Sequence, residues 1–312
     1  MLRYKADART LAFVTSLFGL MALAWTWPPA WPLRIALIVA IGCMSFFCAV
    51  ITHNTVHAPV FQQRWLNRIF QVVLTLTYGH PVSSFVPGHN MSHHVHTQTR
   101  KDIMRTTKAR FRWNLLNQLF FAAIVSGAIS KAEWQYASAM RKERPRWFRQ
   151  LILETVALVV FYATLLVLDW QKAILYVWIP HVHAAWGVVG INFVQHDGCD
   201  TSSKVNHSRN FMSPILNWWT FNNGYHGMHH IKPGLHWSLL PQMHQSILAP
   251  TIHPNLEQRS LVAYLWLAYI WPGKRVDYLG RPVVLPDEGP DEAWIPGIMD
   301  TPAEVSLGAI HS

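Results

Sequence analysis

Eight of the eighteen histidines in this sequence occur in three short clusters, in which the spacing brings imidazole rings together. His53 and His57, for example, lie four residues apart, and residues with this spacing share one face of a helix. Neutral imidazole is a ligand for zinc, copper, iron and nickel. We therefore expect a metal centre formed by these eight and a ninth histidine: His53, His57, His89, His93, His94, His196, His226, His229 and His230.

The number of histidines bears on the kind of metal centre. Nine imidazoles exceed the four ligands of one tetrahedral zinc. Two metals with roughly four or five nitrogen ligands each fit the number, and open coordination positions favour iron and oxygen chemistry. A pair such as His53 and His57 is, by itself, more often a polar contact at an interface. All nine are expected at one end of the predicted membrane helices, and this convergence favours the metal site.

The composition indicates which surroundings hold these histidines. Hydrophobic residues make up 51% of the 312 residues and charged residues 13%, against a usual charged share of about 25%. So little charge cannot cover a soluble surface, so part of the chain is expected to face lipid. Three cysteines without a C-x-x-C pair exclude a disulfide scaffold. The net charge of +10 fits a membrane surface, and no basic–aromatic module supports nucleic-acid binding.

Long apolar runs predict four membrane-spanning helices, since a bilayer core requires about 20 mostly apolar residues. The four predicted spans, in two hairpins, are residues 10–28, 34–52, 150–168 and 173–194. The apolar stretch 114–130 is shorter and is interpreted as an interfacial helix. Lys and Arg gather before the first span and in the segment 100–149. By the positive-inside rule, both termini and the predicted metal site are expected in the cytoplasm.

The predicted fold is therefore an all-α membrane protein. Residues 1–275 are expected to form one domain, in which two transmembrane hairpins carry a cytoplasmic helical cap that holds the dimetal site. Residues 276–312 are rich in Pro, Asp, Glu and Gly and are expected to form an extended tail. No function is assigned to this tail.

Three histidine motifs carry a family resemblance. His53–His57, His89–His94 and His226–His230 match, in order, the patterns H-x(3–4)-H, H-x(2–3)-H-H and H-x(2–3)-H-H. Over about residues 35–245 the chain resembles the integral-membrane di-iron fatty acid desaturases and related hydroxylases. The resemblance implies two iron ions, O2 as cosubstrate, and a buried tunnel for a long apolar chain.

The segment from Asn192 to His196 is similar to the element that supplies another histidine in the same family. Acyl desaturases have N-x-x-x-H here and alkane hydroxylases have N-x-x-E-H, so Gln195 is a mild argument against the second branch. Asn192 lies one helical turn from His196 and is a candidate to contact a metal or its water. Further candidates near the metal are His207 and Asp197, because ligating imidazoles usually donate their second N–H to an oxygen.

Asp102 and Asp200 are candidates for the same role, and the alternative for each acid is a solvated loop residue or an ion pair. His207 has two interpretations, one that orients a ligand and one that contacts a lipid headgroup. His181 and His183 lie too far before His196 to share its site and are expected to pack between helices or at an interface.

The resemblance implies O2-dependent desaturation of a lipid acyl chain. The alternative is a hydroxylase or ketolase of the same family that acts on an acyl chain, alkane or carotenoid. A more distant alternative is a histidine-rich metal-binding membrane protein. No haem-binding or iron–sulfur segment occurs in the sequence, so a separate ferredoxin, rubredoxin or b-type cytochrome is expected to deliver electrons.

Overall fold

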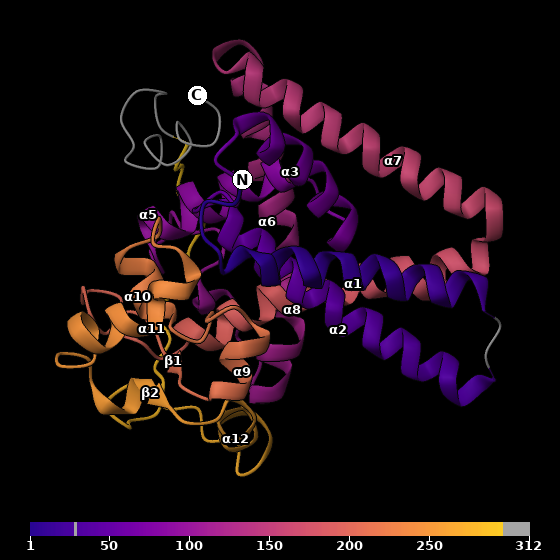
Figure 1. Ribbon diagram of the computed structural model, residues 1–312. Coiled ribbons are helices and arrows are strands. Elements are labelled where there is room, and N and C mark those ends of the chain that lie inside the picture. Colours follow the sequence, from indigo (N-terminus) through magenta and orange to yellow (C-terminus); the bar gives the residue numbers. More distant parts are fainter. Residues whose placement is uncertain (28–29, 296–312) are drawn as a thin grey trace. The chain divides into compact units, whose positions relative to one another are not determined.

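The computed structural model describes residues 1–27 and 30–295 of the protein (Figure 1). These residues are mostly helical, with strand limited to two pairs of residues, and the prediction of an all-α fold is confirmed. The chain divides into two compact units. The first unit contains residues 1–86 and 137–188, and the second contains residues 87–136 and 189–295. Residues 296–312 of the predicted tail lie outside the described residues.

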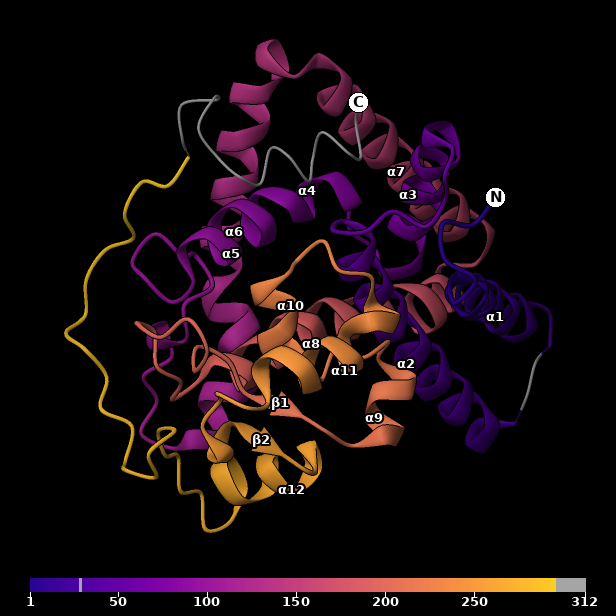
Figure 2. The ribbon, with the colours of Figure 1, turned by 60° about the vertical axis from the view of Figure 1, so that its left-hand side comes forward.

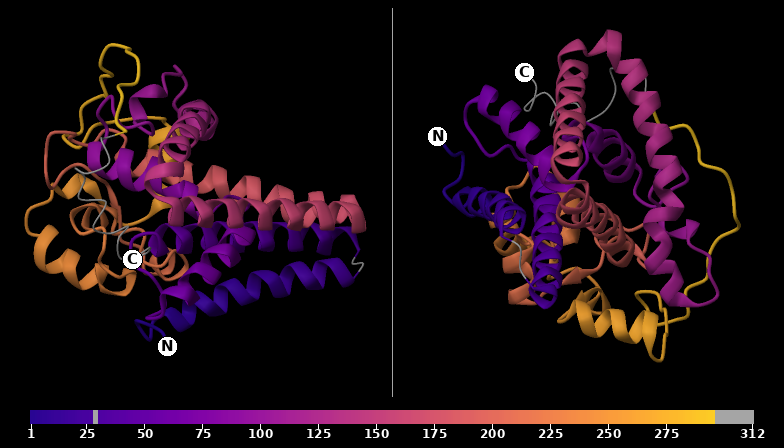
Figure 3. Two further views of the ribbon diagram at one scale, coloured as in Figure 1. Left: turned by 90° about the horizontal axis from the view of Figure 1, so that it is seen from above. Right: turned by 90° about the vertical axis from the view of Figure 1, so that its right-hand side faces the viewer.

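Long apolar helices form most of the first unit. They are α1 (Asp7–Thr26), α2 (Trp31–Thr55) and α7 (Pro145–Ala173), followed by the π-helical segment Ile174–Trp178 and the start of α8 (Ile179–His196). Pro32 near the start of α2 and Pro145 at the start of α7 suit these positions, because the first turn of a helix needs no backbone N–H there. In Figures 1 and 3, α1 and α2 form a hairpin, drawn in indigo.

Side chains on the inner faces of these helices hold the unit together. Leu17 of α1 and Ile41 of α2 are fully buried. Ser45 of α2 donates a hydrogen bond of 2.6 Å to the Thr77 carbonyl of α3 (Arg64–Tyr78). Helix α3 ends at Gly79, whose φ of 77° is in the left-handed region that favours glycine.

The predicted turn between the last two spans is confirmed. Asp169 has φ −163° and ψ 94°, so the helix breaks there, and its carboxylate accepts a hydrogen bond of 3.1 Å from the Lys172 backbone N–H. His181 and His183 pack beyond this turn, as expected. Tyr162 OH lies 2.7 Å from Nδ1 of His181, and the Gly42 carbonyl lies 3.1 Å from Nδ1 of His183.

Four helical segments are long and apolar enough to cross a membrane: Asp7–Thr26, Trp31–Thr55, Asn114–Glu143 and Pro145–His196. The last contains both spans predicted over 150–168 and 173–194. The helix that contains the stretch 114–130 is longer than predicted: α6 continues to Glu143 and has 30 residues, so its length and composition also fit a span. The interpretation of this stretch as an interfacial helix stays a prediction. The extension of α6 beyond Ser130 includes Lys131, Ala132 and Glu133, which favour helix without lengthening the apolar run.

In the second unit, residues 114–136 of α6, the end of α8 and several short helices surround one apolar core. The short elements of this unit include the π-helix Pro87–His93, α5 (His94–His96), α9 (Pro214–Trp219), α10 (His226–Ile231), α11 (Leu240–Met243) and α12 (Leu261–Leu265). Strands β1 (Asn210–Phe211) and β2 (Glu257–Gln258) pair in parallel, Asn210 with Glu257 and Phe211 with Gln258. Phe121, Phe193, Phe211 and Tyr269 are central to the core.

An extended stretch, residues 281–295, runs along the second unit and appears in yellow in Figure 2. The backbone N–H of Glu292 donates to the Arg100 carbonyl at 3.0 Å. Asp291 pairs with Arg105 and also with Lys108, whose Nζ lies 2.8 Å from its Oδ2. This stretch therefore binds the loop between α5 and α6.

Candidate metal centre

Four histidines of the second unit form a cluster of ring nitrogens. The Nε2 atom of His196, at the end of α8, lies 3.1 Å from Nε2 of His93, 2.9 Å from that of His226 and 3.2 Å from that of His230. His226 and His230 lie on one face of α10 with their Nε2 atoms 3.1 Å apart. Each ring thus offers one nitrogen to a common point, and all four nitrogens lie within 4.8 Å of one another.

The hydrogen bonds on the far side of two of these rings show what the cluster can hold. Nδ1 of His93 lies 2.8 Å from Oδ2 of Asp102, and Nδ1 of His196 lies 2.9 Å from the His207 carbonyl. Both partners only accept, so each Nδ1 carries the proton, and in a neutral ring the Nε2 then bears a lone pair. Two lone pairs that face each other at 3.1 Å repel unless a cation lies between them.

The separations fit metal ligands. Two nitrogens at about 2.1 Å from one metal and at right angles to each other are about 3.0 Å apart. The four contacts among His93, His196, His226 and His230 measure 2.9–3.2 Å. Burial, together with the neighbouring rings, lowers the pKa of His230 well below its ordinary value, so this ring is neutral and able to ligate.

A second group of ring nitrogens is formed by His89, His94 and His229. Nε2 of His94 lies 3.0 Å from that of His89 and 3.1 Å from that of His229. The π-helix explains this arrangement, since its wider turn brings His89 beside His94, five residues later. His93 and His94 then contribute to different groups although they are adjacent in the chain.

His53 and His57 belong to the first unit, where they lie at and just after the end of α2. Both are buried, with 5% and 6% of their surface exposed, and their ring centroids are 5.6 Å apart. The prediction that they share one face is therefore confirmed.

Asp102 is the acid that orients a histidine. Its side chain is fully buried, and its oxygens also accept hydrogen bonds of 2.8 Å from the backbone N–H groups of Gln98 and Met104. Burial acts to raise the pKa of Asp102, but the His93 ring and these hydrogen bonds outweigh it and hold the pKa below its ordinary value. A carboxylate on the second nitrogen of a ligating histidine is common in metal sites.

Asp197 and His207, two further candidates near the metal, are placed differently. Asp197 follows His196, but its carboxylate accepts hydrogen bonds from Nε of Arg275 at 2.6 Å and from Tyr269 OH at 3.0 Å. Asp197 therefore forms an ion pair, which was the alternative interpretation of this acid. His207 contributes its carbonyl to His196, while its ring centroid is 5.4 Å from that of His230. Burial lowers the pKa of the His207 ring to about 4, so this ring is neutral at neutral pH.

Asn192 is buried one helical turn before His196. Within residues 1–27 and 30–295, its Nδ2 has no hydrogen-bond partner. A buried amide donor without a partner is unfavourable and is typical of a position that binds a water or ligand. This orphaned donor fits the prediction that Asn192 contacts a metal-bound group.

Several supporting residues were not predicted from the sequence. Gln195 donates a hydrogen bond of 2.9 Å to the Asn223 carbonyl and so connects α8 to the turn before α10. The Asn210 side chain accepts a hydrogen bond of 2.8 Å from the Gly227 backbone N–H in the first turn of α10. At Gly224 a Cβ would collide with the Phe211 carbonyl and the Asn217 side chain. Of these residues, only Gly224, in the sequence N-N-G-Y-H, could have been recognised from its local sequence, as a glycine in a turn. The other contacts join residues that are distant in the chain.

Comparison with known proteins shows one family model that matches the chain, described as "Fatty acid desaturase", over residues 11–260. Alkane 1-monooxygenase of Ectopseudomonas oleovorans is 24% identical over 277 residues, which cover 84% of this chain and 66% of that protein. The chain thus spans just under two thirds of its length. Sphingolipid delta(4)-desaturase DES1 of Drosophila melanogaster is 24% identical, over 77% of this chain and 73% of that protein. Sphingolipid delta(4)-desaturase/C4-monooxygenase DES2 of Rattus norvegicus is 23% identical, over 83% of this chain and 76% of that protein.

Proposed function

Because the chain belongs to the fatty acid desaturase family, we propose that it is a membrane oxidoreductase that uses O2 to desaturate an acyl chain of a lipid. The observation that carries this proposal is the contact between His93 and His196, whose Nε2 atoms face each other with lone pairs at 3.1 Å. An arrangement of this kind is stable around a cation. Four candidate membrane-spanning segments support a substrate that the bilayer delivers.

We further propose that the metal is iron and that two ions are bound. His93, His196, His226 and His230 would hold one of them. His89, His94 and His229 would hold the other. The order of the three histidine motifs in the sequence supports His53 and His57 as the remaining ligands, so that all nine predicted histidines are used. When bound, the two irons would activate O2 and remove hydrogen from an unactivated C–H bond.

The surrounding residues of this chain act on the ligands. Asp102 keeps the proton of His93 on Nδ1 and directs its Nε2 inward, and the His207 carbonyl does the same for His196. Asn192 supplies an amide N–H for a water or another oxygen ligand near His196. His93, His196 and His226 are each at most 2% exposed, so their burial excludes bulk water from the reaction.

Desaturation converts –CH2–CH2– and O2, with two electrons and two protons, into –CH=CH– and two waters. The three cysteines of the sequence, Cys43, Cys48 and Cys199, are fewer than an iron–sulfur cluster of the four-cysteine type requires, which supports a separate protein as the source of the electrons. We propose a ferredoxin, rubredoxin or b-type cytochrome as the donor. From the distribution of Lys and Arg, we place both termini and the metal site in the cytoplasm.

Hydroxylation of an acyl chain, alkane or carotenoid is the second candidate, and the similarity to alkane 1-monooxygenase favours it. Gln195 stands where the alkane-hydroxylase pattern has Glu, and its side chain is bound to the Asn223 carbonyl. The two reactions differ in product mass, which makes them separable in one experiment.

The test is mass spectrometry of total lipids from cells that express the protein with an electron donor, beside a His93→Ala control. A lipid two hydrogens lighter, absent from the control, is the expected result. A lipid one oxygen heavier would replace desaturation by hydroxylation. Purified protein that retains iron in stoichiometric amounts but consumes no O2 with reduced donor and a lipid extract would instead favour a metal-binding membrane protein.

A further inference from the structure

A pocket of about 480 Å³ lies between α3 and α7 of the first unit. It contains none of the histidines, and its lining residues are Arg68, Ile69, Val72, Val73, Arg146, Arg149, Gln150 and Leu153. We propose that this pocket binds an anionic phospholipid, with the phosphate on the arginines and the start of an acyl chain on the apolar residues. This site is separate from the reaction proposed above.

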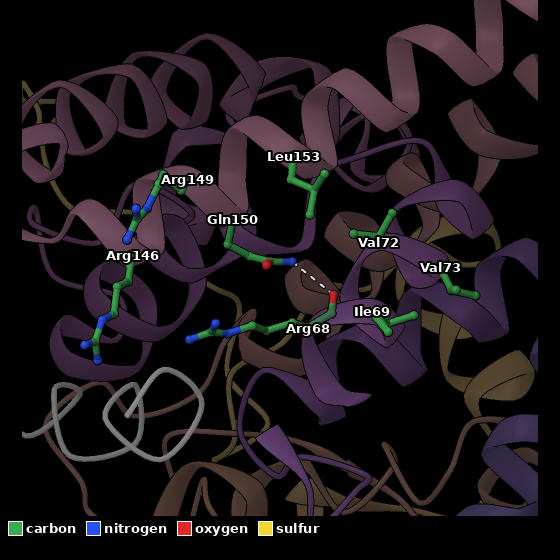
Figure 4. A pocket seen from close by; sticks show the side chains of 8 residues that line it. All are labelled: Arg68, Ile69, Val72, Val73, Arg146, Arg149, Gln150 and Leu153. Carbon is green, nitrogen blue, oxygen red and sulfur yellow. Dashed lines mark hydrogen bonds between the residues drawn. The ribbon is translucent and has the colours of Figure 1, made fainter. Parts of the chain in front are cut away.

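The pocket has a charged end and an apolar end. In Figure 4 the guanidinium groups of Arg68, Arg146 and Arg149 lie on one side, and Val72 and Leu153 lie on the other. A headgroup with one negative phosphate and a hydrocarbon chain has the same division. Guanidinium groups bind phosphate oxygens through paired N–H donors, which a single lysine cannot provide.

The positive charge of the pocket is not neutralised by nearby acids. Among residues 1–27 and 30–295, no carboxylate is in ion-pair distance of the three arginines that line the pocket. Glu154 is one turn from Gln150, but its oxygens accept hydrogen bonds from Ser83, at 2.7 Å from the backbone and 3.1 Å from the hydroxyl. The three guanidinium groups thus have no carboxylate partner among residues 1–27 and 30–295, and the pocket can accept an anion.

Hydrogen bonds fix the wall of the pocket. Gln150 is buried, and its Nε2 donates a hydrogen bond of 3.1 Å to the Arg68 carbonyl of α3 (Figure 4). The same Nε2 also donates to Glu154 at 2.9 Å. The hydrogen bond between Gln150 and Arg68 thus joins α3 and α7, the two helices that carry the arginines, at the wall of the pocket. A pocket that is held in place before binding costs less conformational entropy when its ligand arrives.

Exposed apolar side chains beside the pocket favour a lipid over a soluble anion. Trp65 and Ile69 of α3 are 61% and 54% exposed, and Ile152 and Leu153 of α7 are 47% and 53% exposed. Arg146 and Arg149 lie in the first turns of α7, whose following residues are apolar and belong to a candidate span. Basic pockets between membrane helices at this level are typical sites for anionic headgroups.

The test compares lipid binding by native mass spectrometry of the full-length protein in detergent. The probes are phosphatidylglycerol, phosphatidylcholine with the same acyl chains, neutral diacylglycerol and inorganic phosphate. The variant R68Q/R146Q/R149Q removes the three charges. The matched control R64Q/R141Q/K142Q removes three charges from exposed residues of the same unit that do not line the pocket.

We expect phosphatidylglycerol to bind in preference to the other three probes. The pocket variant should bind it at least about tenfold more weakly, and the control variant should bind like the unchanged protein. The readout does not depend on turnover or on iron, so it stands apart from the enzymatic proposal.

Three results would overturn the lipid proposal. One is equal weakening in both variants, which would mean a nonspecific effect of net charge. Another is inorganic phosphate that displaces phosphatidylglycerol completely at equal concentration, which would mean an anion site without use of the acyl chain. The third is unchanged lipid binding in the pocket variant together with lost binding of an acidic electron donor, which would assign the arginines to protein docking. Circular dichroism of both variants verifies that each is folded.

Discussion

Nδ1 of His93 lies 2.8 Å from Oδ2 of Asp102, and both side chains are completely buried although nine residues separate them in the chain. The acid is also held by the backbone N–H groups of Gln98 and Met104. Its only side-chain partner in the described part of the chain is the histidine. This contact therefore determines which nitrogen of His93 is free to bind a metal.

Asp102→Asn should lower the affinity for the iron at His93, and the activity, by about 10- to 100-fold, the usual cost of losing an outer partner of a metal ligand. The amide can present its N–H to His93 and so favour the other tautomer, which turns a protonated Nε2 toward His196. Iron per purified chain measures the effect directly. Asp200→Asn is the control, since the Asp200 carboxylate accepts hydrogen bonds from Ser202 and Tyr278 and, within the described residues, from no histidine. Full iron content in Asp102→Asn would remove the acid from the metal site.

His207→Ala should retain most of the iron and activity. His196 bonds to the backbone carbonyl of residue 207, which any amino acid supplies, and the His207 ring carries no charge at neutral pH because burial lowers its pKa to about 4. His196→Ala should abolish the activity and remove the iron that His196 would hold. Equal losses in the two variants, measured side by side, would mean that the His207 ring itself is a ligand.

Gly224→Ala should displace the third histidine cluster. A methyl group at this position meets the Phe211 carbonyl and the Asn217 side chain, which hold the turn before α10. We expect a loss of about 2 kcal/mol or more in the free energy of unfolding, together with a lower iron content. Gly234→Ala is a matched control, because no atom lies within 4 Å of its added Cβ. Comparable stability of the two variants in thermal unfolding would contradict this interpretation.

Much of this site could be predicted from the sequence because its signals are local. The apolar runs indicated the helices, and four-residue spacing in His53–His57 and His226–His230 indicated shared faces. The group of His89 with His94 needed a π-helix, which the α-helical spacing rule does not predict. The length of α6 was underestimated, because its second half is polar and was not counted with the apolar stretch.

Contacts between distant residues could not be predicted in the same way. Asp102 was one of several acids near the histidine clusters, and only the loop conformation distinguishes it from Asp197, which pairs with Arg275. No pattern in the acidic tail indicates that Asp291 meets Arg105, 186 residues earlier.

Removal of the metal should destabilise the second unit. Without a cation, the lone pairs of His93 and His196 face each other at 3.1 Å, and the binding free energy is lost as well. A site saturated 100-fold above its dissociation constant contributes about 2.7 kcal/mol, so a chelator should lower the melting temperature by about 5 °C or more. Fe(II) should restore it. The variant His93→Ala/His196→Ala keeps the group of His89, His94 and His229, so the chelator should lower its melting temperature by less than that of the unchanged protein. An equal fall in both proteins would contradict a metal at His93 and His196.

Asp291→Asn should loosen the extended stretch 281–295. Partial burial acts to raise the pKa of Asp291, but hydrogen bonds from Lys108 and Arg105 outweigh it and hold the pKa below its ordinary value. A carboxyl group of this kind stabilises the folded state above the ordinary aspartate pKa of about 3.9, and the contribution is lost as the pH falls through the lowered value. The contact should therefore be constant between about pH 5 and 8 and should weaken only below about pH 4.

Hydrogen exchange of residues 281–295 and of the loop 98–108 measures this contact. Asp291 is 35% exposed and solvent screens the pair, so the variant should lose no more than about 1 kcal/mol of local stability. Arg105 lies in the loop 98–108 and donates its backbone N–H to the Asp102 carbonyl at 3.2 Å. The faster exchange should therefore extend to the residues around Asp102. Asp277→Asn is the control, since its partner Arg281 is 67% exposed and lies outside the loop. Unchanged exchange of 98–108 in Asp291→Asn at pH 7 would show that the extended stretch does not support the loop that positions His93.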